Sequence, residues 1–173
     1  NEVSLEGQPA LMTAAAAGNP EVVRLLLKRG ADMNAIEPFR GQTALMWAAA
    51  EGNAPAAEEL IEFGAHVATK SKSGLTPLLF AVRNAHIETV KALLKHGANV
   101  NDVAADGTSA LNMAVVNAYF ELASVLLDAG AEVVAYDPEG MEAAAAIMPG
   151  VTMVQSAYAA IEGADAIALV TEW

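Results

Sequence analysis

The amino-acid sequence predicts a mainly α-helical solenoid of four helix-turn-helix repeats, followed by a small C-terminal α/β segment with a parallel sheet. Glycines recur at intervals of 33 residues, both where each copy opens and where it closes. The opening glycines are Gly41, Gly74 and Gly107, and the closing glycines are Gly64, Gly97 and Gly130. An earlier copy, from Gly7 to Gly30, is offset by 34 residues, so one residue has been added between Asn34 and Gly41. Self-similarity at a fixed period of this length indicates a stacked-repeat protein.

The copy from Gly74 to Asn101 shows why each repeat is expected to fold as two short helices. Thr76 is a suitable N-cap, and Pro77 can occupy the first helical turn, where its missing N–H costs nothing. Apolar side chains then recur at helical spacing in both halves of the copy, and Gly97 supplies the left-handed residue that ends the second helix. Helices of about two to three turns do not persist alone in water. Neighbouring copies must therefore cover each other's apolar faces.

The other copies keep this pattern with local departures. In the second copy, Ala56 and Ala57 replace the usual aliphatic pair, which we expect to weaken packing there. In the fourth copy, Ser109 and Ala110 replace the Thr-Pro pair. The predicted repeats span approximately residues 5–35, 36–69, 70–102 and 103–131.

The tail after Ala131 follows a different pattern. Residues 132–136, 151–154 and 165–171 are predicted strands, and residues 138–148 and 156–161 are predicted helices, an alternation typical of a small parallel sheet. Residues 1–131 carry 14 acidic and 9 basic side chains, a net charge of −5, whereas residues 132–173 carry 7 acidic and none that are basic. Such a shift predicts a boundary near Glu132, between a repeat domain (1–131) and an α/β segment (132–173) resembling half of a Rossmann-like fold.

Composition argues against several functional classes. Hydrophobic residues make up 54% of the chain and charged residues 17%, which excludes a disordered chain, and no run of 18 apolar residues is present to span a membrane. Without cysteine there are no disulfides, thiolate catalysis or cysteine-bound metal. A net charge of −12 argues against nucleic acid or anionic membrane as a partner. Because residue 1 is Asn and the first repeat lacks an obvious polar capping helix, we expect a fragment, a processed form or a trimmed chain.

The repeats resemble a known family. Their openings are GQPALMTAAAAG, GQTALMWAAAEG, GLTPLLFAVRNA and GTSALNMAVVNA, and their closings are RGADMNA, FGAHVAT, HGANVND and AGAEVVA. These resemble the ankyrin patterns G-x-T-P-L-H-x-A-A-x-x-G and G-A-D-V-N-A over residues 5–131. The resemblance implies a non-catalytic module, without cofactor or metal, whose concave face binds another protein.

Positions that face the partner in ankyrin proteins differ between the copies of this chain. At the turn tips they are Phe39, Arg40, Gln42, Lys72, Ser73 and Leu75. Near the ends of the first helices they are Glu51, Arg83, Asn84 and Asn117. A column along the first helices is expected at Thr13, Trp47, Phe80 and Met113, and it serves either as inter-repeat packing or as an apolar strip that anchors a partner. Variation between copies also follows from simple tolerance.

The tail resembles a second family. The string GAEVVAYDPEGM…VTMVQSAYAAIEGADAIALVTEW is similar to part of the C-terminal, UDP-binding domain of the UDP-glucose/GDP-mannose dehydrogenases, over residues 129–173. The catalytic cysteine and the glycine-rich dinucleotide loop of that family have no counterpart here, and its nucleotide-contacting basic residues lie upstream of the matching segment. The resemblance implies a fold fragment without an activity. A natural fusion, a designed chimera and a composite sequence remain open.

The titratable residues point to no reactive centre. His86 lies at an inter-helix turn, where the ankyrin pattern often has histidine, and is predicted to be structural; His66 and His96 lack a partner at metal-ligand spacing. Asp137 is interpreted as a turn former rather than a ribose-binding acid. A solvated helix face is expected at Glu58, Glu59 and Glu62.

Two functional hypotheses follow. The main one is a non-catalytic protein-interaction module. The alternative is a fusion or chimera that retains a fragment of a nucleotide-sugar dehydrogenase fold. Its role would be structural, or it would form a homo-oligomer through the unpaired edge of the C-terminal sheet. A remnant that still binds a nucleotide sugar is a variant of this alternative.

Overall fold

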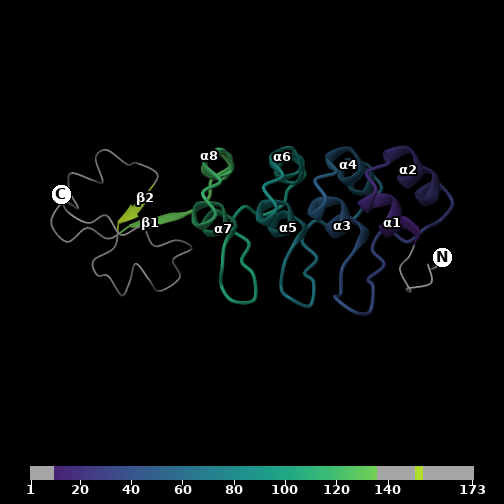
Figure 1. Cartoon of the computed structure of the whole chain (residues 1–173), viewed down its shortest axis with the longest axis horizontal. Helices are drawn as coiled ribbons and strands as arrows, with labels where there is room; N and C mark the ends of the chain where they lie inside the picture. The colour runs from purple at the N-terminus through teal and green to yellow at the C-terminus, as the bar shows by residue number, and fades with distance from the viewer. Residues whose placement is uncertain (1–9, 136–150, 154–173) are drawn as a thin grey trace.

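The structure is a computed structural model that describes residues 10–135 and 151–153. Four helix pairs form the repeats. The first helices are α1 (Ala10–Ala16), α3 (Ala44–Ala50), α5 (Pro77–Arg83) and α7 (Ala110–Val116), and the second helices are α2 (Pro20–Lys28), α4 (Ala54–Glu62), α6 (Ile87–Lys95) and α8 (Phe120–Asp128). First helices form one row and second helices another, and each helix packs on its equivalent in the next repeat (Figure 1). The prediction of a mainly helical repeat solenoid is confirmed.

Hydroxyl caps begin α3, α5 and α7, and Thr76 at α5 is the cap that the sequence predicts. Thr76 has an extended backbone, and its hydroxyl oxygen accepts a hydrogen bond from the backbone N–H of Leu79 at 3.4 Å. Ser109 does the same for Asn112 at 3.1 Å, so the fourth repeat keeps its cap although it lacks the Thr-Pro pair. A hydroxyl cap satisfies one of the free N–H groups at the start of a helix. The sequence therefore fixes the phase of these helices locally.

The turn between the two helices of each repeat requires a left-handed residue. Glycine provides it in the first two repeats, with φ of +69° at Gly18 and +75° at Gly52. Alanine adopts the same conformation in the last two repeats, with φ of +58° at Ala85 and +57° at Ala118. A side chain with a Cβ is strained in this region, whereas glycine is not. The last two repeats therefore carry backbone strain that the first two avoid.

Replacing Ala118 by glycine is expected to raise the free energy of unfolding by about 0.5–1 kcal/mol, because relief of the left-handed strain exceeds the added entropy of the unfolded chain. Ala118 is exposed, so no packing is lost. Ala129→Gly is the control: Ala129 is also exposed but has an ordinary φ of −82°, and the change is expected to destabilise. Urea unfolding measures both, and a loss of stability in Ala118→Gly would contradict the argument.

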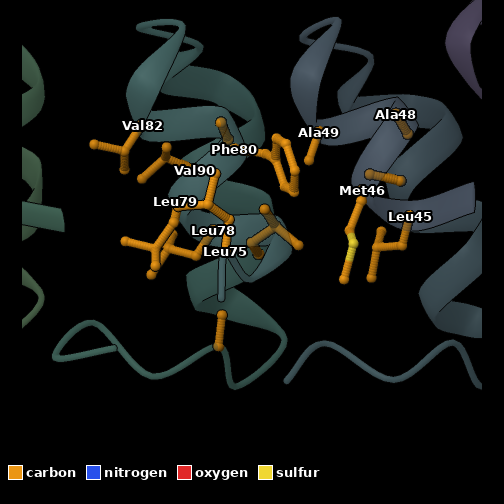
Figure 2. Close-up of a cluster of buried hydrophobic side chains, with 14 of the residues drawn as sticks. Leu45, Met46, Ala48, Ala49, Leu75, Leu78, Leu79, Phe80, Val82 and Val90 are labelled. Atoms are coloured by element: carbon orange, nitrogen blue, oxygen red, sulfur yellow. The ribbon is translucent and has the colours of Figure 1, made fainter. Parts of the chain in front are cut away.

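The hydrophobic core is built from both helices of each repeat, and Figure 2 shows the part of it formed by α3, α5 and α6. Leu78, Leu79 and Val82 of α5 are fully buried, as is Val90 of α6. The first helices also bury small side chains completely, and these are Ala15, Ala48, Ala49, Ala81 and Ala114. The alanines of the second repeat, Ala56 and Ala57, are fully buried as well. The expectation that packing is weaker there stays a prediction.

Extended loops join successive repeats and project from one side of the stack (Figure 1). We call them finger 1 (residues 31–43), finger 2 (65–76) and finger 3 (98–109). Each tip is closed by a backbone hydrogen bond of 3.0 Å: Glu37 to Gln42, Ser71 to Leu75, and Ala104 to Thr108. The bond spans five positions in finger 1 and four in the others. The residue added between Asn34 and Gly41 therefore lengthens the tip of finger 1.

Past the repeats, the structure describes two short strands. β1 (Val133–Ala135) pairs in parallel with β2 (Val151–Met153), and Val134 is opposite Thr152. Both lie within predicted strands. The remaining tail elements, residues 138–148, 156–161 and 165–171, lie outside the described residues. The α/β segment and the division at residue 132 stay predictions.

Candidate partner-binding surface

A buried carboxylate organises the tip of finger 1. Glu37 is 4% exposed. One of its oxygens, Oε2, accepts the backbone N–H of Phe39 at 2.7 Å, and the other, Oε1, accepts those of Arg40 at 2.7 Å and Gln42 at 3.0 Å. Burial raises the pKa of Glu37, but these N–H groups and the Lys72 ammonium outweigh it and leave the pKa below its ordinary value. The carboxylate thus holds the tip in one conformation.

Glu37→Gln is expected to lower the free energy of unfolding at neutral pH by about 1–3 kcal/mol. The carboxamide has one acceptor oxygen where the carboxylate has two, so one side loses its hydrogen bonding and the other keeps only neutral bonds. A carboxyl whose pKa is lower in the folded state stabilises above its unfolded pKa of about 4.3, and this contribution disappears as pH falls through the folded pKa. The difference in stability between wild type and variant should therefore begin to shrink as the pH falls below about 4.3. Denaturant unfolding from pH 7 to 3 measures it, with Glu121→Gln on an exposed helix start as the control.

Fingers 1 and 2 are locked together behind their tips. The backbone N–H of Lys72 donates to the carbonyl oxygen of Arg40 at 2.9 Å, and the Lys72 ammonium donates to the carbonyl oxygen of Pro38 at 2.6 Å. Gly41 allows this approach, since a Cβ there would lie 3.1 Å from the Lys72 backbone nitrogen. These contacts join the two tips into one continuous ledge.

Most residues predicted to contact a partner are exposed. They are Phe39, Arg40, Glu51, Lys72, Ser73, Arg83, Asn84 and Asn117. Gln42, Trp47 and Met113 are half-buried. Leu75 and Phe80 are buried, at 7% and 2% exposed, and have almost no surface to offer a partner. Among the apolar side chains of the set, Phe39 is the most exposed, at 78%.

The predicted residues fall into separate groups. Arg83 lies over the ring of Phe80, with its guanidinium carbon 4.9 Å from the ring centroid, so an exposed cation covers a buried aromatic. On α7, the Asn117 amide donates to the carbonyl oxygen of Met113 at 2.7 Å. The column along the first helices is uneven in exposure: Thr13 is exposed, while Trp47 has a buried indole N–H with no partner among the described residues. Burial of Phe80 favours packing over partner contact at that position.

The comparisons with known proteins agree with the helix-pair architecture. A family model described as ankyrin repeats (3 copies) matches residues 1–71 and again residues 58–137. The chain is an ankyrin-repeat protein. A second model, the UDP-binding domain of the UDP-glucose/GDP-mannose dehydrogenase family, matches residues 118–173 and shows what the tail is similar to. A search of curated proteins found no match.

Polar side chains at the inter-helix turns form hydrogen bonds to the preceding ankyrin repeat. The Asn53 amide donates to the carbonyl oxygens of Ala15 and Ala16, at 3.0 and 2.7 Å. One repeat later, the Asn84 amide lies 2.7 Å and His86 Nε2 lies 3.0 Å from the carbonyl oxygen of Ala50. The structural role predicted for His86 is confirmed by this bond. At the next junction, Asn117 bonds within its own helix instead.

One acidic residue of the ankyrin stack was assigned incorrectly from the sequence. Glu59, expected on a solvated face, is 8% exposed. Its Oε2 accepts a hydrogen bond from Arg24 Nε at 2.9 Å, and its Oε1 pairs with Arg24 Nη2, which ties α2 to α4. Hydrogen bonding from Arg24 holds the pKa of Glu59 below its ordinary value in spite of burial. Glu58 is half-buried and Glu62 is exposed.

Sequence reasoning also missed part of the exposed surface of this ankyrin protein. Ile36 is 58% exposed on finger 1, and Val116 and Phe120 are 76% and 77% exposed on the last repeat. For finger 1 the sequence contains a signal, because the residue added between Asn34 and Gly41 and the acidic Glu37 both break the regular repeat pattern. Over residues 10–135 and 151–153, no three His, Cys, Asp or Glu side chains gather in a metal-binding group. Those ranges also contain no helix that is both long and apolar enough to cross a membrane.

Proposed function

We propose that this chain is a non-catalytic module that binds a protein partner through its finger tips and the adjoining ends of its first helices. Ankyrin repeats typically lack catalysis and generally mediate contacts between proteins. The observation that carries the proposal is the ledge of fingers 1 and 2. It presents an aromatic side chain 78% exposed on a backbone held by the buried carboxylate of Glu37. Preorganised surfaces bind with a smaller loss of conformational entropy.

The proposed contact set follows from exposure. It consists of Phe39, Arg40, Gln42, Trp47, Glu51, Lys72, Ser73, Arg83, Asn84, Met113 and Asn117. Leu75 and Phe80 lie beneath this surface and support it. Exposed aromatic and arginine side chains commonly contribute most to binding, so Phe39 and Arg83 are the proposed principal anchors.

Alanine variants test the site once a partner has been captured and purified. Phe39→Ala and Arg83→Ala are each expected to weaken its binding at least about fivefold, as for side chains central to an interface. Lys91→Ala is the matched control, because Lys91 is an exposed cation on the second-helix row, paired with Glu88 at 2.9 Å, and no change is expected. Circular dichroism checks folding. Unchanged affinity in both anchor variants, with folding intact, would exclude this surface.

A second candidate rests on the match of residues 118–173 to the UDP-binding domain. In this alternative the tail is a fragment of a dehydrogenase fold with a structural or self-association role, and β1 and β2 supply an edge for pairing between chains. Sedimentation of the full chain and of residues 1–131 tests it. A larger assembly for the full chain alone supports self-association, whereas monomers in both cases contradict it. Titration with a UDP-sugar is expected to release no heat.

A further inference from the structure

The three fingers differ in charge in a way that the net charge of the protein conceals. The chain carries a net charge of −12, but finger 2 contains two lysines, Lys70 and Lys72, and no acidic residue. Arg40, at the tip of finger 1, lies beside Lys72, whose backbone N–H donates to its carbonyl oxygen. Arg40 and both lysines are exposed. Finger 3 has the opposite character, with Asp102 and Asp106 and no basic residue.

The buried carboxylate of Glu37 does not occupy these cations in an ion pair. Glu37 directs both oxygens at backbone N–H groups and is 4% exposed, so it offers no ion pair at the surface. Lys72 uses its ammonium for the Pro38 carbonyl oxygen, and Lys70 for that of Val103 at 3.1 Å. An ammonium group has three donors, so each lysine keeps donors for a further acceptor. Among the described residues, Arg40, Lys70 and Lys72 form no ion pair, although the buried Glu37 carboxylate attracts Lys72.

An apolar surface adjoins these cations. Phe39 is 78% exposed and precedes Arg40 directly, and Ile36 lies three positions earlier on the same finger with 58% exposed. Exposed aromatic side chains are common anchors in protein interfaces, and the backbone on both sides of Phe39 is held by the hydrogen bonds to Glu37. The same short stretch therefore offers an aromatic face and positive charge together.

We propose that the tips of fingers 1 and 2 bind an acidic peptide segment of the partner that also carries a bulky apolar side chain. Its carboxylates bind Arg40, Lys70 and Lys72, and its apolar side chain packs on Phe39. Finger 3 repels acidic residues through Asp102 and Asp106, so the acidic part of the segment lies over fingers 1 and 2. This inference rests on the proposed function and specifies the chemistry of the partner at that surface.

Selection of a random-peptide phage library on the full chain tests the proposal. Enriched peptides are expected to combine Asp or Glu with Leu, Ile, Phe or Trp, and their affinity should fall with added salt. In fluorescence anisotropy with the synthetic peptide that binds best, Phe39→Ala is expected to weaken binding about tenfold and Arg40→Ala about threefold. Lys91→Ala is the control and should leave the affinity unchanged. All three positions are exposed, so the variants should fold.

The other outcomes separate this inference from the proposed function. Basic or uncharged selected peptides overturn the inference. So does binding that survives Phe39→Ala but is lost in Arg83→Ala, and in both cases the interaction module stands. A selection that enriches no peptide at all counts against the acidic-segment proposal and against peptide recognition by the fingers. Acidic peptides lacking any apolar residue, with Phe39→Ala unchanged, overturn the aromatic part of the proposal.

Discussion

Leu93→Ala is expected to lower the free energy of unfolding by about 3 kcal/mol. Leu93 is fully buried in α6, and removing buried methyl groups costs both their transfer from water and the cavity that remains, about 2–5 kcal/mol. The helices of one repeat depend on their neighbours, so the loss should spread. Denaturant unfolding gives the magnitude, and hydrogen exchange should show faster exchange in α4 and α8 as well as in α6.

Leu127→Ala is the matched control for that experiment. It makes the same chemical change near the end of a second helix, but Leu127 is 46% exposed. Its loss should cost less than about 1 kcal/mol, because the remaining cavity is open to water. Equal losses at the two positions would contradict the stacked core as the source of stability.

Gly52→Ala is expected to cost about 2–3 kcal/mol. The residue has φ of +75°, where a Cβ is strained by about 1–2 kcal/mol. That Cβ would also lie 2.5 Å from His86 Nδ1. The imidazole must therefore move, and its bond to the carbonyl oxygen of Ala50 is lost, at about 1 kcal/mol. Thermal and denaturant unfolding measure the loss.

Two further variants isolate the contribution of the ring. Gly64 has φ of +98°, but a Cβ there would meet nothing within 4 Å, so Gly64→Ala should show the backbone cost alone. Combining Gly52→Ala with His86→Ala should cost less than the sum of the single changes, since the steric conflict is removed. Strict additivity in this pair would show that the clash has no energetic effect.

Local rules account for the parts of the fold that the sequence predicts well. Thr76 and Ser109 cap helices through hydroxyl groups that bond only a few positions away, and Gly97 adopts φ of +85° at the end of α6, as its spacing predicts. These features need no knowledge of the neighbouring repeat. The helix pairs and their phase therefore follow from the chain itself.

Contacts between repeats are harder to predict. Arg24 and Glu59 are 35 positions apart, one repeat and one residue, and a search for opposite charges at that spacing would have found the pair. Burial of Phe80 had no such signal, because the same column position is exposed at Thr13 and half-buried at Trp47. The size of each neighbouring side chain decides how much of the column is covered. The buried carboxylate of Glu37 depends on a lengthened tip that has no second example among the three fingers.

The uneven hydrogen bonds between the inter-helix turns predict that the junction between the third and fourth repeats bends more easily than the other two. Asn53 ties the second repeat to the first, and Asn84 with His86 ties the third to the second, whereas Asn117 turns back onto its own helix. Under a bending load the first three repeats should deform as one elastic body. The fourth repeat should rotate relative to the other three, about the junction between α5–α6 and α7–α8.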